Sequence, residues 1–370
     1  MASPGRPTVR DEFHIAIICA LPIEADAITL LFDHLWDDDD NPYGRTPGDT
    51  NTYTTGRIGL HNVVLFVLPN MGISGAAAAT VGLRSSYRSL ELALLVGICG
   101  GVPKIAGDDA FLGDVVVSKT IVQYDYGRQY PGNFAMKKTV EDSLGRANKD
   151  IRSLLASFET RRGMKLLQTK ATEHLKRLQK AAATNNLQSG GRRRRKQPDY
   201  VYPGIAEDKL YPPEYTHVHR ESCELCLGGS GDFCLLASKA SCADTKCDEA
   251  KLVTREFPFE DGESYIPEIF IGNIGSGNAV MKSGQDRDRI AATHDLIAFE
   301  MEGAGAWDEV PCIVIKGICD YADSHKNKIW QDFAAATAAS VAKAVLERYV
   351  VNDEALAQAR GLKAPTSGKN

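Results

Sequence analysis

The sequence predicts an α/β fold in which a central mixed sheet is flanked by helices and interrupted by a large irregular insertion. Short apolar runs rich in β-branched residues indicate buried strands, and segments with helical periodicity alternate with them. Glycine-rich turns follow several of these runs. The 370 residues are 43% hydrophobic and 25% charged, which is typical of a soluble globular protein. The net charge of −5 argues against a general nucleic-acid-binding protein, because such a protein needs a basic surface.

The first predicted elements follow one another closely along the chain. Residues 13–20 form a buried strand, and a helix begins at Pro22, where the missing N–H costs little. Residues 53–58 and 62–68 read as a hairpin, and an alanine-rich helix covers residues 76–83.

The remaining elements extend the same alternation. Further strands are predicted at residues 92–96, 114–117, 268–271 and 312–316, and further helices at residues 299–307 and 333–349. The last helix has an amphipathic pattern. Because ligands of α/β sheets bind beyond the carboxyl ends of the strands, we expect the functional site there.

Three carboxylates stand where predicted strands give way to turns or helices: Glu24, Glu302 and Asp320. Each lies in a longer motif, and two glycine-rich motifs fall between them. In chain order the five motifs are residues 15–24, 96–101, 275–278, 299–304 and 315–323. Together they resemble the purine nucleoside phosphorylase / methylthioadenosine nucleosidase superfamily, and most closely its fungal nucleosidase-like branch, which often carries the stretch found at residues 317–326.

The resemblance covers most of residues 13–135 and 266–349, and it implies a nucleoside phosphorylase-like three-layer fold. It also implies that Asp320 protonates the purine base as it leaves, which requires a raised pKa. Glu302 would bind the ribose hydroxyl groups, with Met301 packed under the sugar. Further substrate-binding residues implied by the motifs are Met71, Gly100, Asn278 and Glu300.

The position of Glu24 bears on the choice of nucleophile. Phosphorylases of the family carry Arg at the positions of Glu24 and Leu95 and Ser at the position of Ile98. A carboxylate repels a phosphate dianion but can orient and deprotonate water. We therefore predict a purine nucleosidase that releases free base and ribose from nucleosides of the adenosine, inosine or guanosine type, with Glu24 as the general base and no cofactor.

Two alternatives stay open. A phosphate-dependent phosphorylase would need Arg57 or Arg84 to reach the pocket. A non-catalytic nucleoside-sensing module is the second, because fungal relatives are often fused to nucleotide-binding oligomerisation modules and repeats. The chain contains neither module, which favours a free-standing enzyme, and the resemblance implies a homo-oligomer.

The domain limits follow from the pattern. Residues 1–10 read as a disordered leader and residues 351–370 as a loose tail, around a catalytic domain at 11–350. No run approaches the roughly 18 apolar residues of a membrane helix. We therefore expect a cytoplasmic protein with reduced thiols and no membrane partner.

Residues 140–265 form the predicted insertion, with a basic linker at 192–196 and a His/Cys-rich segment at 217–247. Five of the nine cysteines fall in that segment. A structural zinc ion could bind His217, His219, Cys223 and Cys226, because Cys-x₂-Cys is a zinc-knuckle spacing. Free cysteines are the alternative, since the downstream cysteines are irregularly spaced, and disulfides would be unusual in a reducing compartment. No catalytic metal is expected.

Two further residues follow Asp320 in its motif. Asp323 is expected to cap a turn or form a salt bridge. His325 is expected on the surface.

Overall fold

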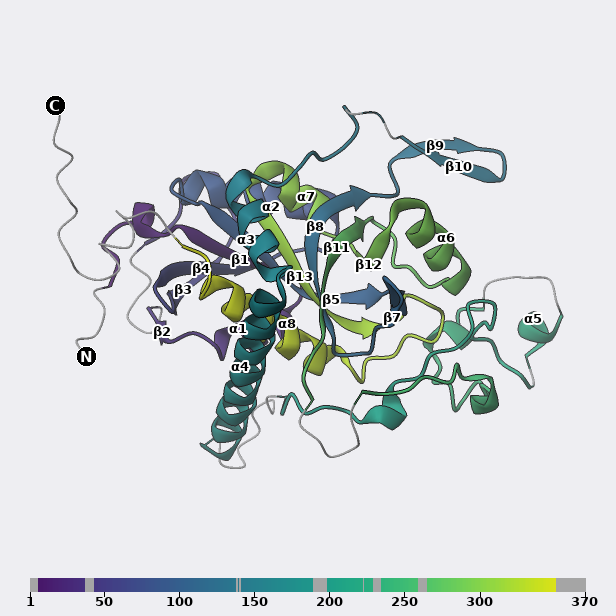
Figure 1. Cartoon of the computed structure of the whole chain (residues 1–370). Coiled ribbons are helices and arrows are strands. Elements are labelled where there is room, and N and C mark those ends of the chain that lie inside the picture. The colour runs from purple at the N-terminus through teal and green to yellow at the C-terminus, as the bar shows by residue number, and fades with distance from the viewer. Residues whose placement is uncertain are drawn as a thin grey trace.

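The computed structural model describes residues 6–36, 43–137, 139, 141–188, 198–221, 223–228, 234–258 and 265–350 (Figure 1). Residues 1–5 of the predicted leader, the basic linker at 192–196 and the predicted tail at 351–370 lie outside these described residues.

Residues 6–10 differ from the predicted leader, because they lie against the rest of the chain. The guanidinium Nη2 of Arg6 donates to the Trp36 carbonyl at 3.0 Å. The Tyr43 hydroxyl donates to the Pro7 carbonyl at 2.8 Å. These bonds join positions 30 and 36 residues apart, which local composition does not reveal.

The strands are β1 (Ile15–Cys19), β2 (His34–Leu35), β3 (Tyr53–Ile58), β4 (His61–Val67), β5 (Leu92–Gly101), β6 (Lys104–Ile105), β7 (Asp108–Asp109), β8 (Val115–Gln123), β9 (Gly127–Tyr130), β10 (Asn133–Met136), β11 (Ile269–Ser276), β12 (Leu296–Glu300) and β13 (Cys312–Asp320). The α-helices are α1 (Pro22–Thr29), α2 (Ile73–Ser86), α3 (Lys149–Phe158), α4 (Arg161–Gln188), α5 (Glu224–Leu227), α6 (Gly284–His294), α7 (Gly303–Glu309) and α8 (Gln331–Leu346). The described residues also contain the single 3₁₀ turns η1 (Arg10–Glu12), η2 (Ile205–Glu207), η3 (Ala237–Lys239) and η4 (Glu249–Lys251).

Nine strands form one mixed sheet in the order β12-β11-β8-β13-β5-β1-β4-β3-β2. The central strands β4, β1, β5 and β13 are parallel, whereas β8 runs antiparallel to β13. β12 also pairs with β5, with Phe299 opposite Gly100, so that five strands close into a ring. This pairing brings the end of β12 beside the ends of β5 and β13.

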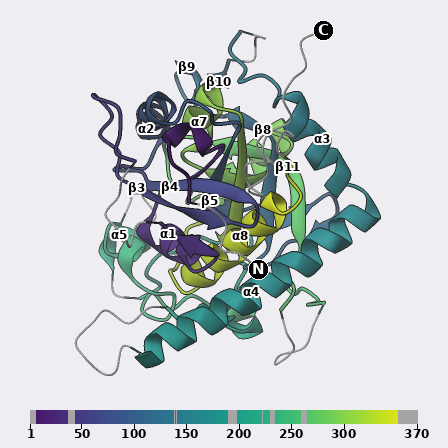
Figure 2. The ribbon, with the colours of Figure 1, turned by 90° about the vertical axis from the view of Figure 1, so that its left-hand side faces the viewer.

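Helices cover both faces of the sheet, which confirms the predicted α/β fold with a central mixed sheet. Figure 2 shows α1, α8 and α4 on one side of the strands and α2 and α7 on the other. α8 packs directly on β5 and β13, and α4 packs on the outside of α8. Of the described helices, none is both long and apolar enough to cross a membrane.

Two sequence predictions for helices are wrong in detail. The predicted helix at 299–307 begins only at Gly303, because Leu296–Glu300 is a strand whose last residue caps the helix. The helix predicted at 333–349 has no solvent-exposed face, since every residue from Phe333 to Leu346 is buried. α4 covers the side of α8 that would otherwise meet solvent.

The insertion divides into two structurally different parts. Its first part is helical, and α4 turns an apolar stripe toward α8. The buried residues of that stripe are Leu167, Ala171, Leu175, Leu178 and Ala182. In the second part, the described residues between 198 and 258 contain only α5 and three 3₁₀ turns. An ion pair at 2.6 Å between Arg255 and Asp208 holds this second part together, and Arg255 also donates to the Tyr321 hydroxyl just beyond β13.

Candidate active site

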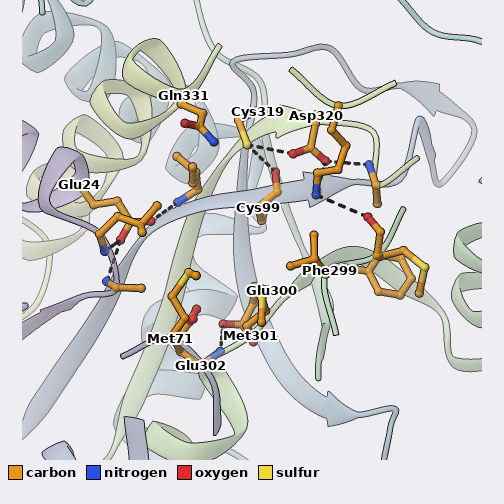
Figure 3. Close-up of a pocket in the computed structure, with 18 of the residues that line it drawn as sticks. Glu24, Met71, Cys99, Phe299, Glu300, Met301, Glu302, Cys319, Asp320 and Gln331 are labelled. Atoms are coloured by element: carbon orange, nitrogen blue, oxygen red, sulfur yellow. Dashed lines mark hydrogen bonds and ion pairs between the residues drawn. The ribbon is translucent and has the colours of Figure 1, made fainter. Parts of the chain in front are cut away.

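A cavity of about 200 Å³ lies where the ends of β5, β12 and β13 meet (Figure 3). Its walls include all three predicted catalytic carboxylates and most of the predicted substrate-binding residues. The predicted residues that line it are Glu24, Met71, Gly100, Glu300, Met301, Glu302 and Asp320. Figure 3 shows Glu24 and Asp320 on opposite sides of the cavity, with Glu302 and Met301 on a third side.

Glu24 is held by backbone donors at the start of α1. Its Oε2 accepts from the amides of Ala20 and Leu21 at 2.7 and 2.9 Å, and its Oε1 accepts from the amide of Ile98 at 2.9 Å. Oε1 therefore keeps a lone pair for another donor. Burial raises the pKa of Glu24, and this increase outweighs the opposing effects of Lys316 and the backbone donors. A raised pKa makes the ionised carboxylate a stronger base.

Gly97 on β5 makes room for this carboxylate. A Cβ at position 97 would lie 2.1 Å from Glu24 Oε1, which is far inside van der Waals contact. We expect Gly97→Ala to displace the Glu24 carboxylate and to lower the rate of reaction on the order of 10²-fold, because misplacement by about 1 Å costs that much. Steady-state kinetics of Gly97→Ala, Glu24→Gln and the double variant measure this. If Gly97→Ala acts through Glu24, the two losses are strongly non-additive, and fully additive losses would contradict the explanation.

Glu302 presents a carboxylate with few protein partners. Its Oε1 accepts from the Gly72 amide at 3.3 Å, and its Oε2 lies 3.6 Å from the ammonium of Lys316. Lys316 is fully buried in β13, and its Nζ has no hydrogen-bond partner among the described residues. Burial alone would lower the pKa of Lys316, but Glu24, Glu302 and Glu300 together raise it. One ammonium thus balances three carboxylates.

Glu300 uses its carboxylate to cap a helix. Its two oxygens accept from the amides of Glu302 and Gly303 at 2.8 to 3.0 Å, at the first turn of α7. Burial raises the pKa of Glu300. Its side chain therefore fixes the backbone that carries Met301 and Glu302.

Asp320 ends β13 with one oxygen well occupied and the other nearly free. Oδ1 accepts from the Ala322 amide at 2.9 Å and lies 3.1 Å from the ammonium of Lys326. Among the described residues, Oδ2 accepts from one donor, the thiol of Cys319 at 3.3 Å. Burial alone would lower the pKa of Lys326, but Asp320 and its neighbours raise it.

Several residues lie elsewhere than the sequence predicts. Asn278 does not line the cavity, because its side chain accepts from the Ile73 amide and donates to Asp125 at the rim. Arg57 lies on β3, and Arg84 pairs with Glu309 on the outer surface, so neither lines the cavity. His325, expected on the surface, is buried with 7% of its area exposed.

Sequence reasoning missed other cavity residues. Lys326 is the last residue of the stretch at residues 317–326 and could have been predicted from it. Lys316 lies within an apolar strand, where the sequence gives no local sign of a function. The cavity is also lined by Phe299, which lies in the motif at residues 299–304. Met281 and Gln331 line it as well, and they lie outside the five motifs.

The chain resembles known proteins in sequence. Residues 14–172 match the model of the phosphorylase superfamily. Over 349 residues the chain is 32% identical to a nucleotide-binding leucine-rich repeat (NLR)-like protein of Hyaloscypha variabilis. That match covers 92% of this chain but only 30% of the relative's length.

Solved structures share the fold. A 5′-methylthioadenosine/S-adenosyl homocysteine nucleosidase of Helicobacter pylori aligns with a TM-score of 0.50 at 13% identity, over 90% of this chain and 98% of that one. Futalosine hydrolase of the same organism aligns with a TM-score of 0.50 at 15% identity, over 90% and 97% of the two chains. A Streptococcus pneumoniae MTA/SAH nucleosidase, solved with 8-aminoadenine, aligns with a TM-score of 0.50 at 16% identity, over 91% and 100%.

The mixed sheet, its closed ring of strands and the cavity at the strand ends define a nucleoside phosphorylase-like α/β protein. The match of residues 14–172 to the phosphorylase superfamily and the fold shared with the solved structures agree with the resemblance carried by the five motifs.

Proposed function

We propose that the protein is a purine nucleosidase, which hydrolyses the N-glycosidic bond of nucleosides of the adenosine, inosine or guanosine type to free base and ribose. The observation that carries this proposal is the charge of the cavity. Glu24, Glu300 and Glu302 share the single ammonium of Lys316, while Lys326 is paired with Asp320.

This charge balance favours water over phosphate as the nucleophile. Among the described residues that line the cavity, Lys326 is the one cationic side chain, and no arginine is present. A phosphate dianion would have to enter beside carboxylates without a bidentate guanidinium to bind it. A ribosyl group that gains positive charge in the transition state is instead stabilised by the same carboxylates.

The two ends of the substrate then meet different groups. Asp320 protonates the base from Oδ2, because Oδ1 is already occupied by Ala322 and Lys326. The ammonium of Lys326 stabilises the carboxylate that remains after the proton has left. On the opposite side, Oε1 of Glu24 accepts a proton from the attacking water, and Glu302 binds the ribose hydroxyl groups.

The proposal predicts that base release does not depend on phosphate. For each nucleoside of a panel, we expect the free base (adenine, hypoxanthine or guanine) to be released at the same rate in buffer with phosphate as in buffer without it. The free base is separated from the nucleoside and quantified. A rate that rises with phosphate concentration and vanishes without phosphate would favour a phosphorylase instead.

A second candidate function is a nucleoside-sensing module, which the NLR-like relative favours because this chain corresponds to 30% of its length. Tight binding of purine nucleosides by calorimetry with no base release over long incubation would support it. A homo-oligomer and a cytoplasmic location stay predictions from the sequence.

A further inference from the structure

The second part of the insertion gathers thiols and imidazoles into two neighbouring clusters. The outer cluster consists of His219, Cys223, Cys226 and Cys234, whose ligand atoms all lie within 4.8 Å of one another. Cys234 takes the place that the sequence prediction gave to His217. The thiols of all three cysteines are free.

The spacing of the outer cluster is that of tetrahedral zinc ligands. The Sγ atoms of Cys223 and Cys234 are 3.9 Å apart, and Nδ1 of His219 lies 3.5 Å from Cys226 Sγ and 3.8 Å from Cys234 Sγ. Zinc bonds of about 2.3 Å to sulfur and about 2.0 Å to nitrogen place tetrahedral ligands roughly 3.5 to 3.8 Å apart. A disulfide would require sulfur atoms about 2.0 Å apart.

The inner cluster joins the insertion to the loop after β13. Its core is His217, Cys247 and His325, whose ligand atoms all lie within 4.8 Å of one another, and Cys242 adjoins this core beside His217. Nδ1 of His217 lies 3.4 Å from Cys247 Sγ and 3.7 Å from Cys242 Sγ, and His325 offers a ring nitrogen within 4.8 Å of both His217 and Cys247. Nε2 of His217 lies 3.1 Å from the carbonyl of Ala240, a contact that places the proton on Nε2 and leaves Nδ1 as a ligand.

An independent observation at the inner cluster points to a ligand. His325 is buried, with 4% of its side chain exposed, yet neither ring nitrogen has a hydrogen-bond partner among the described residues. The carboxylate of Asp323 lies 3.8 Å from Nδ1, beyond hydrogen-bond distance. Leaving a polar group buried and unsatisfied costs about 1 to 3 kcal/mol, and a bound metal removes that cost.

We propose that the insertion binds two structural Zn²⁺ ions, one by His219, Cys223, Cys226 and Cys234 and the other by His217, Cys242, Cys247 and His325. Thiolate and imidazole sets of four are the donors that zinc prefers in closed structural sites.

The fold of the insertion indicates that these ions have a stabilising role. The described residues between 198 and 258 have little regular structure and several exposed leucines, and their buried Tyr200 and Leu210 pack into the main core, so these described residues form no separate apolar core. The exposed leucines are Leu225, Leu227, Leu235 and Leu236. Small segments without a core commonly depend on a metal for stability.

The inner ion has a further consequence, because His325 directly precedes Lys326. The amide of His217 also donates to the Ser324 hydroxyl at 2.9 Å. The inner site therefore fastens the insertion to the segment that carries Lys326, the partner of Asp320.

Metal analysis of the full-length chain tests the proposal. We expect two equivalents of zinc per chain by inductively coupled plasma mass spectrometry after extensive dialysis. Zinc-edge X-ray absorption should show an average of about 2.5 sulfur and 1.5 nitrogen ligands per ion, the mean of a three-sulfur and a two-sulfur site.

Single cysteine variants separate the two sites. Cys226→Ala and Cys247→Ala should each lose one equivalent of zinc and lower the melting temperature, whereas Cys312→Ala, which removes a buried cysteine at the start of β13, should keep both. Zinc-free chain that melts at the same temperature with and without added Zn²⁺ would overturn the proposal. Loss of zinc from Cys226→Ala but not from Cys247→Ala would overturn the inner site. Cysteines that resist alkylation until reduced would indicate disulfides and overturn both sites.

Discussion

Replacing Asp320 by Asn is expected to lower kcat for a purine nucleoside by roughly 10²- to 10⁴-fold, the usual contribution of a general acid. The amide can still accept from Ala322, so the loop should keep its shape, but it cannot give a proton to the base. Steady-state release of free base measures the loss, and substrate affinity should change little.

A riboside with a nitrophenolate leaving group provides the matched control for Asp320→Asn. Nitrophenolate leaves without protonation, so the variant should cleave this substrate at nearly the rate of the unmodified enzyme. An equal loss with both substrates would mean that Asp320 positions the substrate and is not the acid.

Replacing Glu24 by Gln is expected to lower kcat by roughly 10²- to 10⁴-fold while nucleoside binding persists. The amide nitrogen of Gln would face either the Ile98 amide or the pair of amides from Ala20 and Leu21. The variant therefore also loses at least one backbone hydrogen bond, at a cost of about 1 to 3 kcal/mol in stability.

Azide separates the two effects of removing Glu24. In Glu24→Ala, azide can attack the ribosyl centre without giving up a proton, so activity should return as ribosyl azide forms. A fall in stability alone would not be rescued in this way. Unchanged turnover in Glu24→Gln would remove Glu24 as the base.

The pH profile of the unmodified enzyme tests the same role. Glu24 acts as a base only when ionised, and burial raises its pKa. We therefore expect kcat/KM to fall as the pH decreases through a value above the usual glutamate range near 4.3. Glu24→Gln should lose this acidic limb.

Much of the candidate active site could be predicted from the sequence, because its carboxylates stand at or near the ends of predicted strands. Glu24, Glu302 and Asp320 are far apart in sequence, but each stands at or shortly after the end of a strand, and the pairing of β12 with β5 brings those ends to one cavity. The role of Lys316 could not be predicted, because a lysine inside an apolar strand has no local sign of the three carboxylates around it.

Contacts between distant elements explain the other differences. α8 has an amphipathic sequence and is nevertheless buried, because α4 from the insertion covers it. His217 stands close to the Cys-x₂-Cys pair in sequence, yet it lies with Cys247 and His325, which come from distant parts of the chain that local spacing does not reveal. Cys234 completes the outer cluster from eight residues beyond Cys226, a spacing without a recognisable motif.

The identity of the sugar product tests the central claim most directly. The enzyme is incubated with a purine nucleoside in phosphate buffer, and the products are followed by ¹H and ³¹P nuclear magnetic resonance. We predict that ribose appears in the same amount as free base and that no new phosphate ester signal arises. Ribose 1-phosphate in the product, or intact nucleoside after prolonged incubation, would contradict hydrolysis.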